Sequence, residues 1–263
     1  MAKPKTAPKT AQKKITKSQL SGAQDAAREG RIADARPTLE AAAEQGSASA
    51  AYSLAEIAAL QGDWDGVLAR LAQFMPNEKQ IYAGNVKRDV AGLLWRAAEE
   101  TGRWPEAAKL LAGMKENAVG GLFYKSLKRL LTAKGKGAAP KLVHVMGTAK
   151  DYAEHVAKAK AEKDAFGVVM NAKEHASFDA DVVAHFAAAE DELTQFDYVL
   201  DCIPAFVRQK KVAAGWAAFT RKLSDWMNVE DCQIAPIVVL WDPAMRPMMT
   251  PPRCAALLSR KLG

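Results

Sequence analysis

The sequence predicts two consecutive folds: antiparallel helical hairpins in the first half and an α/β domain with a mostly parallel sheet in the second. Two observations lead to this prediction. The phrase G-[RD]-[IW]-x-x-[AV]-x-x-x-L occurs three times, starting at Gly30, Gly62 and Gly102, and an internal repeat indicates a repeated structural unit. After residue 141, short β-branched runs alternate with helical stretches, which is typical of a parallel sheet.

The repeated phrase predicts the turn between two helices. Each glycine follows an alanine-rich apolar stretch, and a residue without a Cβ adopts the left-handed conformation that ends a helix at little cost. The next residues begin a second helix: Asp63 suits a capping position and Pro105 suits the first turn. We expect the small residue five places after each glycine and the leucine nine places after it to be buried. These are Ala35, Val67 and Ala107, and Leu39, Leu71 and Leu111.

The segment from about residue 18 to residue 116 resembles the tetratricopeptide repeat family. The middle copy carries the resemblance with Leu54, Ala55, Gly62, Trp64, Val67, Leu71 and Phe74, followed by Pro76. The third copy matches with Leu94, Trp95, Gly102, Trp104, Ala107 and Leu111. The resemblance implies stacked helical hairpins that bind a protein or peptide on their concave face, which the first helix of each pair builds.

Mapped by position, nine residues would form this partner-binding groove. They are Lys17, Gln24, Arg28, Tyr52, Glu56, Asp89, Arg96, Glu99 and Glu100. Their charges are mixed, unlike the uniformly basic clamp that holds a C-terminal carboxylate in chaperone-binding members of the family, so we do not predict that ligand. The alternative is that the face is only solvated.

The second half is expected to contain a linker and then the sheet. Residues 132–141 are rich in Gly, Lys, Ala and Pro, a composition typical of a linker, which places a repeat domain at 18–131 and the α/β domain at 142–263. Near-continuous apolar strands are typical of a sheet covered on both faces. The expected strands are 142–146, 166–170, 196–203 (or the continuation of the preceding helix) and 234–241, the last with the strongest signal. The expected helices are 151–164, 178–193, 205–227 and a final one from about Pro252.

This sheet suggests an alternative function, the binding of a nucleotide or dinucleotide. The order of segments, and Phe196 to Asp201 in particular, is similar to the cofactor domain of medium-chain alcohol dehydrogenases. The resemblance implies a site at the carboxyl ends of the strands. The residues there would be Gly147, Thr148, Asn171 and Asp201, with Asp242 nearby. However, no G-x-G-x-x-G fingerprint follows a strand and no Cys/His zinc set is present.

No metal site and no catalytic residue are predicted. Asp151 with His155, and Asp181 with His185, are pairs four residues apart that share a helix face and could supply mixed ligands. Helix capping and a polar face explain both pairs more simply. The motifs of a nucleophile elbow and of a phosphate loop do not occur. We therefore favour a non-catalytic interaction protein, such as an adaptor, a chaperone or an immunity-type inhibitor, over an enzyme.

The net charge of +7 belongs to the N-terminus. Residues 1–20 hold six lysines and no acid, and the 37 basic residues less those six leave 31 against 30 acidic ones. The tail 1–17 is too polar and proline-rich to order itself, and nucleic acid is expected to bind only weakly, through this tail. Three widely spaced cysteines without a C-x-x-C pair suit a reducing, cytoplasmic location. No apolar run is long enough for a membrane span.

Overall fold

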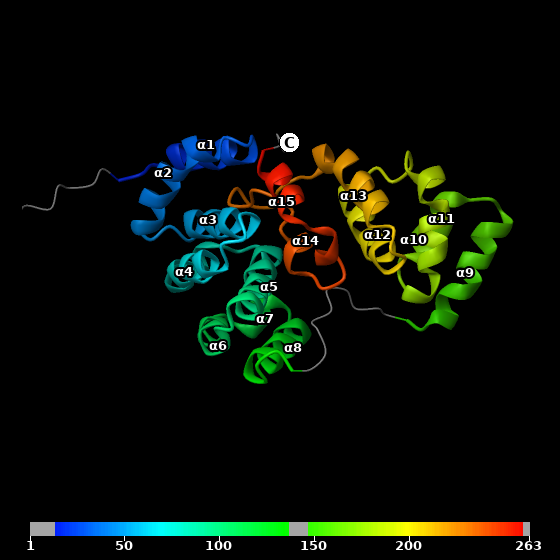
Figure 1. Ribbon diagram of the computed structural model, residues 1–263, viewed down its shortest axis with the longest axis horizontal. Coiled ribbons are helices and arrows are strands. Elements are labelled where there is room, and N and C mark those ends of the chain that lie inside the picture. Colours follow the sequence, from blue (N-terminus) through cyan, green and yellow to red (C-terminus); the bar gives the residue numbers. More distant parts are fainter. Residues whose placement is uncertain (1–13, 137–146, 260–263) are drawn as a thin grey trace, which may run out of the picture.

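The computed structural model describes residues 14–136 and 147–259, and within these ranges every regular element is an α-helix or a short 3-10 helix (Figure 1). The described residues contain no strand. The predicted C-terminal α/β domain with a parallel sheet is therefore wrong, and the described chain is all helical.

The first half forms helical hairpins that stack on one another (Figure 1). The hairpins pair α1 (Lys17–Arg28) with α2 (Ile32–Glu44), α3 (Ala48–Leu60) with α4 (Trp64–Phe74), and α5 (Gly84–Thr101) with α6 (Trp104–Ala112). A 3-10 helix, η1 (Met75–Gln80), joins the second pair to the third. The short helix α7 (Glu116–Val119) and the helix α8 (Gly121–Thr132) close this first array by packing on α5 and α6.

The three repeated glycines end their helices as predicted. Gly30, Gly62 and Gly102 have φ angles of 79°, 73° and 72°, in the left-handed region that favours glycine. In the first two turns the next N–H reaches back to the last helical turn, Arg31 to the Ala26 carbonyl and Asp63 to the Ala58 carbonyl. All six residues expected in the core are buried. The helical hairpins of the first half are confirmed.

The second half forms another helical array. Its elements are α9 (Ala149–Ala161), α10 (Ala165–Ala172), η2 (Ala176–Phe178), α11 (Asp179–Ala189), α12 (Phe196–Arg208) and α13 (Val212–Arg221). The predicted strand 166–170 lies in α10, the predicted strand 196–203 lies in α12, and the predicted strand 142–146 lies outside the described residues. Both apolar runs are instead the buried faces of short helices, which periodicity alone cannot distinguish from strands.

The hairpins of this second array turn through lysine instead of glycine. Lys163 and Lys210 have φ angles of 58° and 57°. The following N–H groups close the same bonds as in the first array: Asp164 donates to the Ala159 carbonyl at 2.9 Å and Lys211 donates to the Phe206 carbonyl at 2.8 Å. The predicted continuous helix 205–227 is consequently broken after Arg208.

The helix that follows the Lys163 turn also begins like the one that follows Gly62. Asp63 accepts the N–H of Gly66 at 2.8 Å, and Asp164 accepts the N–H of Gly167 at 2.8 Å. Both carboxylates are therefore N-caps that lie one residue after the left-handed turn residue. The hairpin geometry of the first half thus continues in the second.

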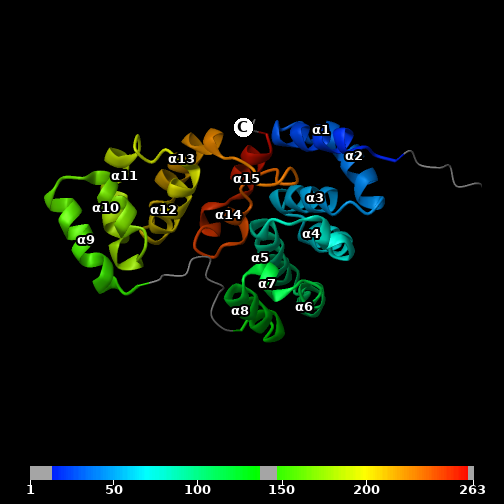
Figure 2. The same ribbon diagram turned by 180° about the vertical axis from the view of Figure 1, so that it is seen from behind.

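The C-terminal part returns to the first array. After η3 (Leu223–Asp225), the chain passes through α14 (Val238–Trp241), η4 (Arg246–Met248) and α15 (Pro251–Leu258). Both views place α14 and α15 between the two arrays (Figures 1 and 2). We call residues 226–249 the docked segment. The predicted strand 234–241 belongs to it and is wrong: its apolar residues are buried among helices of the first array, not in a sheet.

Candidate functional site

The face of α1, α3 and α5 that the docked segment covers contains buried polar side chains. Gln24, Ser53 and Glu56 are almost fully inaccessible, and Arg28 and Asp89 are also buried. The helices around them are rich in alanine, so backbone and long side chains approach closely. A buried polar group destabilises the fold unless it is hydrogen-bonded, and most of these groups find their partners in the docked segment.

Three of these side chains bind the main chain of residues 231–235. Arg28 donates from its guanidinium to the carbonyls of Asp231 at 2.7 Å and of Gln233 at 3.1 Å. The Ser53 hydroxyl donates to the Cys232 carbonyl at 2.7 Å. The Glu56 carboxylate accepts the N–H groups of residues 234 and 235. Main-chain groups of five consecutive residues are therefore hydrogen-bonded to side chains of the first array.

The deepest contact of the docked segment is a tryptophan. Trp241 is 0% exposed, and its indole N–H donates to the Asp89 carboxylate at 3.1 Å. The Tyr52 hydroxyl donates to the other oxygen of that carboxylate at 3.4 Å. The indole lies against Gly92, where an added Cβ would be 2.2 Å from the ring. Only glycine at position 92 leaves room for this side chain.

Burial changes the protonation of the two groove carboxyl groups. Desolvation raises the pKa of Glu56 to about 8, although the hydrogen bond from the Ile234 N–H works in the opposite direction. Desolvation likewise raises the pKa of Asp89 to about 7 against the bonds from Trp241 and Tyr52. The second oxygen of Glu56 is buried and has no hydrogen-bond partner. The covered groove therefore favours neutral carboxyl groups.

The edge of the groove carries a charged network. Arg96 pairs with Glu99 at 2.9 Å and also with Glu100. Arg246 of the docked segment pairs with the same Glu99. Hydrogen bonds from these two arginines lower the pKa of Glu99 against the opposing effect of its partial burial. The network connects α5 to the docked segment, and its two positive and two negative charges balance.

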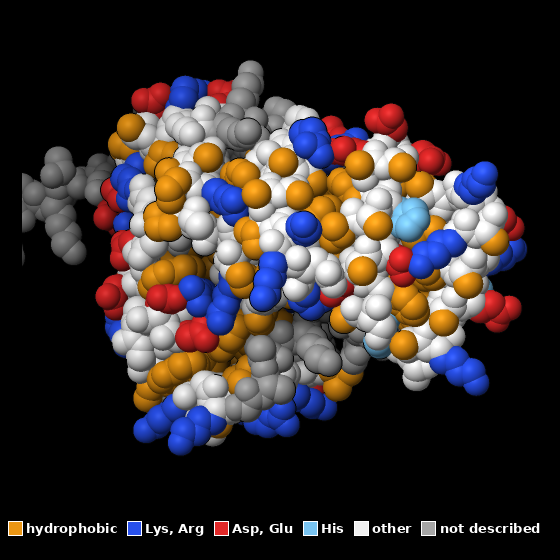
Figure 3. Space-filling model, turned by 45° about the vertical axis from the view of Figure 1, so that its right-hand side comes forward, with side chains coloured by type: hydrophobic (Ala, Val, Ile, Leu, Met, Phe, Trp, Pro, Cys, Tyr) orange, Lys and Arg blue, Asp and Glu red, His pale blue; other side chains and the backbone are white. Residues whose placement is uncertain are grey.

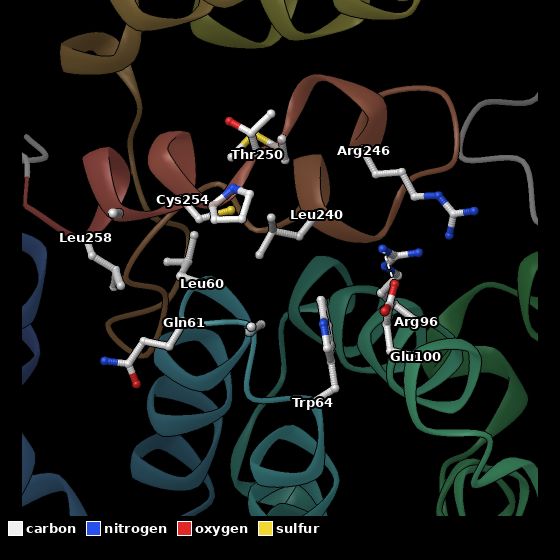
Figure 4. Close-up of a pocket in the computed structure, with 15 residues that line it drawn as sticks. Leu60, Gln61, Trp64, Arg96, Glu100, Leu240, Arg246, Thr250, Cys254 and Leu258 are labelled. Carbon is white, nitrogen blue, oxygen red and sulfur yellow. Dashed lines mark ion pairs between the residues drawn. The ribbon is translucent and has the colours of Figure 1, made fainter.

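A pocket of about 390 Å³ opens beside this network (Figure 4). Arg96 and Glu100 stand at one end of it and Gln61 and Leu258 at the other (Figure 4). The Arg96 guanidinium lies 5.5 Å from the centre of the Trp64 ring. The other lining residues are mostly apolar: Ala59, Leu60, Gly62, Leu240, Arg246, Met249, Thr250, Pro251, Cys254 and Ala255. We call this cavity the rim pocket. It is a composite of the repeats, the docked segment and α15.

The nine groove residues predicted from the sequence fall into three groups. Five lie beneath or beside the docked segment, and a partner would reach them only by displacing it: Gln24, Arg28, Tyr52, Glu56 and Asp89. Arg96, Glu99 and Glu100 form the charged network at the rim. Lys17 is exposed at the start of α1. Their role in binding a partner stays a prediction.

The residues predicted to hold a nucleotide lie on helices instead of strand ends. Gly147 and Thr148 precede α9, where Thr148 and Asp151 form a capping box. Asn171 donates to the Gly167 carbonyl within α10 at 2.7 Å, and Asp201 of α12 pairs with Lys173 at 3.0 Å. These residues were expected to lie together only because the carboxyl ends of parallel strands meet at one edge of a sheet. Without strands in the described chain, that basis is gone.

The Asp/His pairs also have local partners. Asp151 caps α9, Asp181 pairs with Lys160 at 2.5 Å, and the His185 ring lies 2.9 Å from the Asp181 carbonyl. Within residues 14–136 and 147–259, no group of three or more potential ligands is close enough to hold a metal ion.

Sequence reasoning missed Ser53, Gly92, Trp241 and Arg246. One signal was available for Gly92: a glycine inside a helix costs about 1 kcal/mol relative to alanine and often marks a close approach of another group. Nothing in the spacing of residues 226–249 indicates that they return to the first array.

Comparison of the chain with known protein families, with characterised proteins and with solved structures finds no significant match. Of the helices in the described ranges, none combines the length and the apolar character needed to cross a bilayer.

Proposed function

We propose that this chain is a non-catalytic protein-interaction protein that binds a segment of a partner protein at the rim pocket. The observation that carries the proposal is the rim pocket itself, an apolar cavity open to solvent where the repeats meet the docked segment. Exposed apolar concavities of this kind are typical of interaction sites. The resemblance of the first array to tetratricopeptide repeats, which bind proteins, adds support.

The groove proper is a less accessible site than its rim. Displacing the docked segment would expose Trp241 and leave Arg28 and Glu56 without their backbone partners. Each buried polar group that loses its partner costs about 1–3 kcal/mol. A partner that binds at the rim pocket meets none of these costs.

The pocket defines the chemistry of the partner. Its apolar lining accepts one large aromatic or aliphatic side chain, and Trp64 with Arg96 forms the kind of aromatic and guanidinium surface that concentrates binding energy. The balanced charges of Arg96, Glu99, Glu100 and Arg246 select polar groups beside that anchor and not a strongly charged ligand. An adaptor, a chaperone and an inhibitor would all use this mode of recognition.

The test fills the pocket. Ala255 lines it and is exposed, so Ala255→Trp occupies the cavity without disturbing a buried contact. Ala112→Trp, at an exposed position of α6, is the matched control. Crosslinking in native cells followed by mass spectrometry should recover partners with the wild type and the control that Ala255→Trp loses. The same partners with all three proteins, or none with any, would contradict the proposal.

A further inference from the structure

The helix α8 divides into an apolar face and a basic face. Its apolar side chains Tyr124, Leu127, Leu130 and Leu131 are buried against the first array. Its cations Lys125, Lys128 and Arg129 are exposed and follow the spacing of neighbours on one helix face. Lys134 and Lys136 extend the basic surface beyond the helix and are also exposed. We call these five residues the basic stripe.

The basic stripe lacks compensating acids. Residues 117–149 contain six Lys or Arg residues and no Asp or Glu. In the described part of the chain, Lys125 pairs with Glu116 at 3.1 Å, and the other four cations of the stripe have no acid within ion-pair distance. By contrast, Arg31, Arg96 and Arg103 in the same array all pair with carboxylates. The near-neutral total charge beyond the tail therefore hides a local excess of positive charge.

The stripe borders a shallow hollow. Lys125, Lys128, Arg129, Thr132 and Ala133 line a depression of about 420 Å³. At 1.5 Å per residue, the span from Lys125 to Thr132 is about 10 Å along the helix axis. Lys and Arg side chains gather over the lower end of the molecule, where α6 and α8 lie (Figure 3).

We propose that the basic stripe binds the phosphate backbone of nucleic acid without reading its bases. Closely spaced cations along a helix, most of them without an acidic partner, are suited to a row of phosphates, which supply most of the affinity in non-specific binding. The stripe itself consists of Lys and Arg side chains. The basic stripe is independent of the rim pocket. It adds contacts from a folded helix to the weak nucleic-acid binding expected from the lysine tail.

A nucleic-acid backbone fits this surface better than a membrane does. A basic amphipathic helix binds a bilayer by burying its apolar face among the lipids. Here that face is already buried in the first array, and among the large apolar side chains of α8 only Leu122, 61% exposed, offers much accessible surface. A hollow between cations also receives a phosphate ridge more readily than a flat bilayer.

The experiment measures binding of the full-length protein to a fluorescent DNA duplex of about 20 base pairs by anisotropy, between about 50 and 200 mM salt. In a plot of the logarithm of the binding constant against the logarithm of the salt concentration, each phosphate contact contributes about −0.9 to the slope. The test variant is Lys128→Glu/Arg129→Glu. The control, Lys150→Glu/Lys158→Glu on exposed positions of α9, changes the net charge equally and keeps the tail. Circular dichroism and the melting temperature confirm that both variants fold.

The test variant should bind the duplex with an affinity at least about tenfold lower at low salt. The salt dependence of its binding constant should be shallower by the amount expected for the loss of about two phosphate contacts. The control should change the affinity less than about threefold, because its charges lie outside the binding surface. Equal weakening in both variants, or no binding by the wild type, would overturn the proposal. So would tighter binding to phosphatidylserine vesicles than to the duplex.

Discussion

The two helical arrays close their hairpins with the same hydrogen bonds but with different residues. Gly30 and Gly62 make the turn in the first array, and Lys163 and Lys210 make it in the second. A residue with a Cβ in the left-handed conformation costs about 1–2 kcal/mol, so packing of the paired helices enforces the turn even where the local sequence opposes it. Glycine therefore makes this turn less costly but is not required for it.

The arrays differ also in what completes their cores. The second array has a core of its own around Val169, Phe186 and Phe206, although Phe196, Ile203 and Phe219 of the same array belong to the larger core. The first array shares one core with the docked segment, including Trp241. The first array is therefore expected to depend on the C-terminal segment for stability.

Truncation of the central tryptophan gives the largest expected effect. Trp241→Ala should lower the free energy of unfolding by about 3–5 kcal/mol, because it leaves a cavity beside Gly92 and removes the indole N–H that donates to one oxygen of Asp89. Urea denaturation measures the change. The control Met227→Ala, at an 83% exposed position of the same segment, should stay within about 0.5 kcal/mol. A loss below about 1.5 kcal/mol for Trp241→Ala would show that the first array does not depend on the docked segment.

Removing the backbone contacts of Glu56 has a smaller effect. Glu56→Ala leaves the N–H groups of Ile234 and Ala235 buried and unpaired, and we expect a loss of about 2 kcal/mol or more in unfolding free energy. The control Glu44→Ala changes an exposed glutamate at the end of α2. Equal stabilities of the two variants would refute the main-chain recognition inferred for the groove.

The groove also makes stability depend on pH. Above a pH of about 4, the unfolded chain releases protons from Glu56 and Asp89, while the folded chain retains them up to pKa values of about 8 and 7. The folded state then binds more protons than the unfolded state, so the contribution of both groups to stability is lost as the pH rises through this window. Denaturation curves at a series of pH values should show this decline. Glu56→Gln/Asp89→Asn should flatten it, and an unchanged slope would rule out these two groups as its source.

Exchange of the turn residues is expected to give the smallest effects on stability. Lys163→Gly and Lys210→Gly should each raise the unfolding free energy by about 0.5–1 kcal/mol, because the left-handed strain disappears. Gly62→Lys should lower it by about 1 kcal/mol, since space around Gly62 is open and only the backbone conformation opposes the change. Thermal melting measures both. Stabilisation by Gly62→Lys would contradict the shared turn geometry.

The sequence predicted the part of the fold in which local chemistry and tertiary structure agree. Gly30, Gly62 and Gly102 are the cheapest residues for their turns, so the first array is visible in the sequence. Lys163 and Lys210 adopt the same conformation against their propensity, and this hides the second array. The β-branched run at 166–170 misled for a related reason, because such residues pack equally well on a buried helix face. The run at 234–241 is irregular up to Ile237 and helical only from Val238, and it is buried against other helices.

The site could be predicted only in part. Their positions in the repeats were enough to predict that Gln24, Arg28, Glu56 and Asp89 lie on the groove face, because helix periodicity specifies which side chains share a face. Its occupant could not be predicted, since the contact between Arg28 and residues 231–233 spans about two hundred positions of the sequence and leaves no local signal. The basic stripe was not predicted, because the sum of charges over the chain beyond the tail is close to zero and does not show a local excess of positive charge.

We infer that residues 231–235 stay in the groove for as long as the first array is folded. Hydrogen exchange at the amides of Ile234 and Ala235 tests it most directly, because both N–H groups bond to the buried Glu56 carboxylate and to no regular helix. We predict protection close to that of the core amides of α3 and α5, which requires unfolding of the first array. Exchange at the rate of an exposed loop would show that the segment leaves the groove readily, which would contradict this inference.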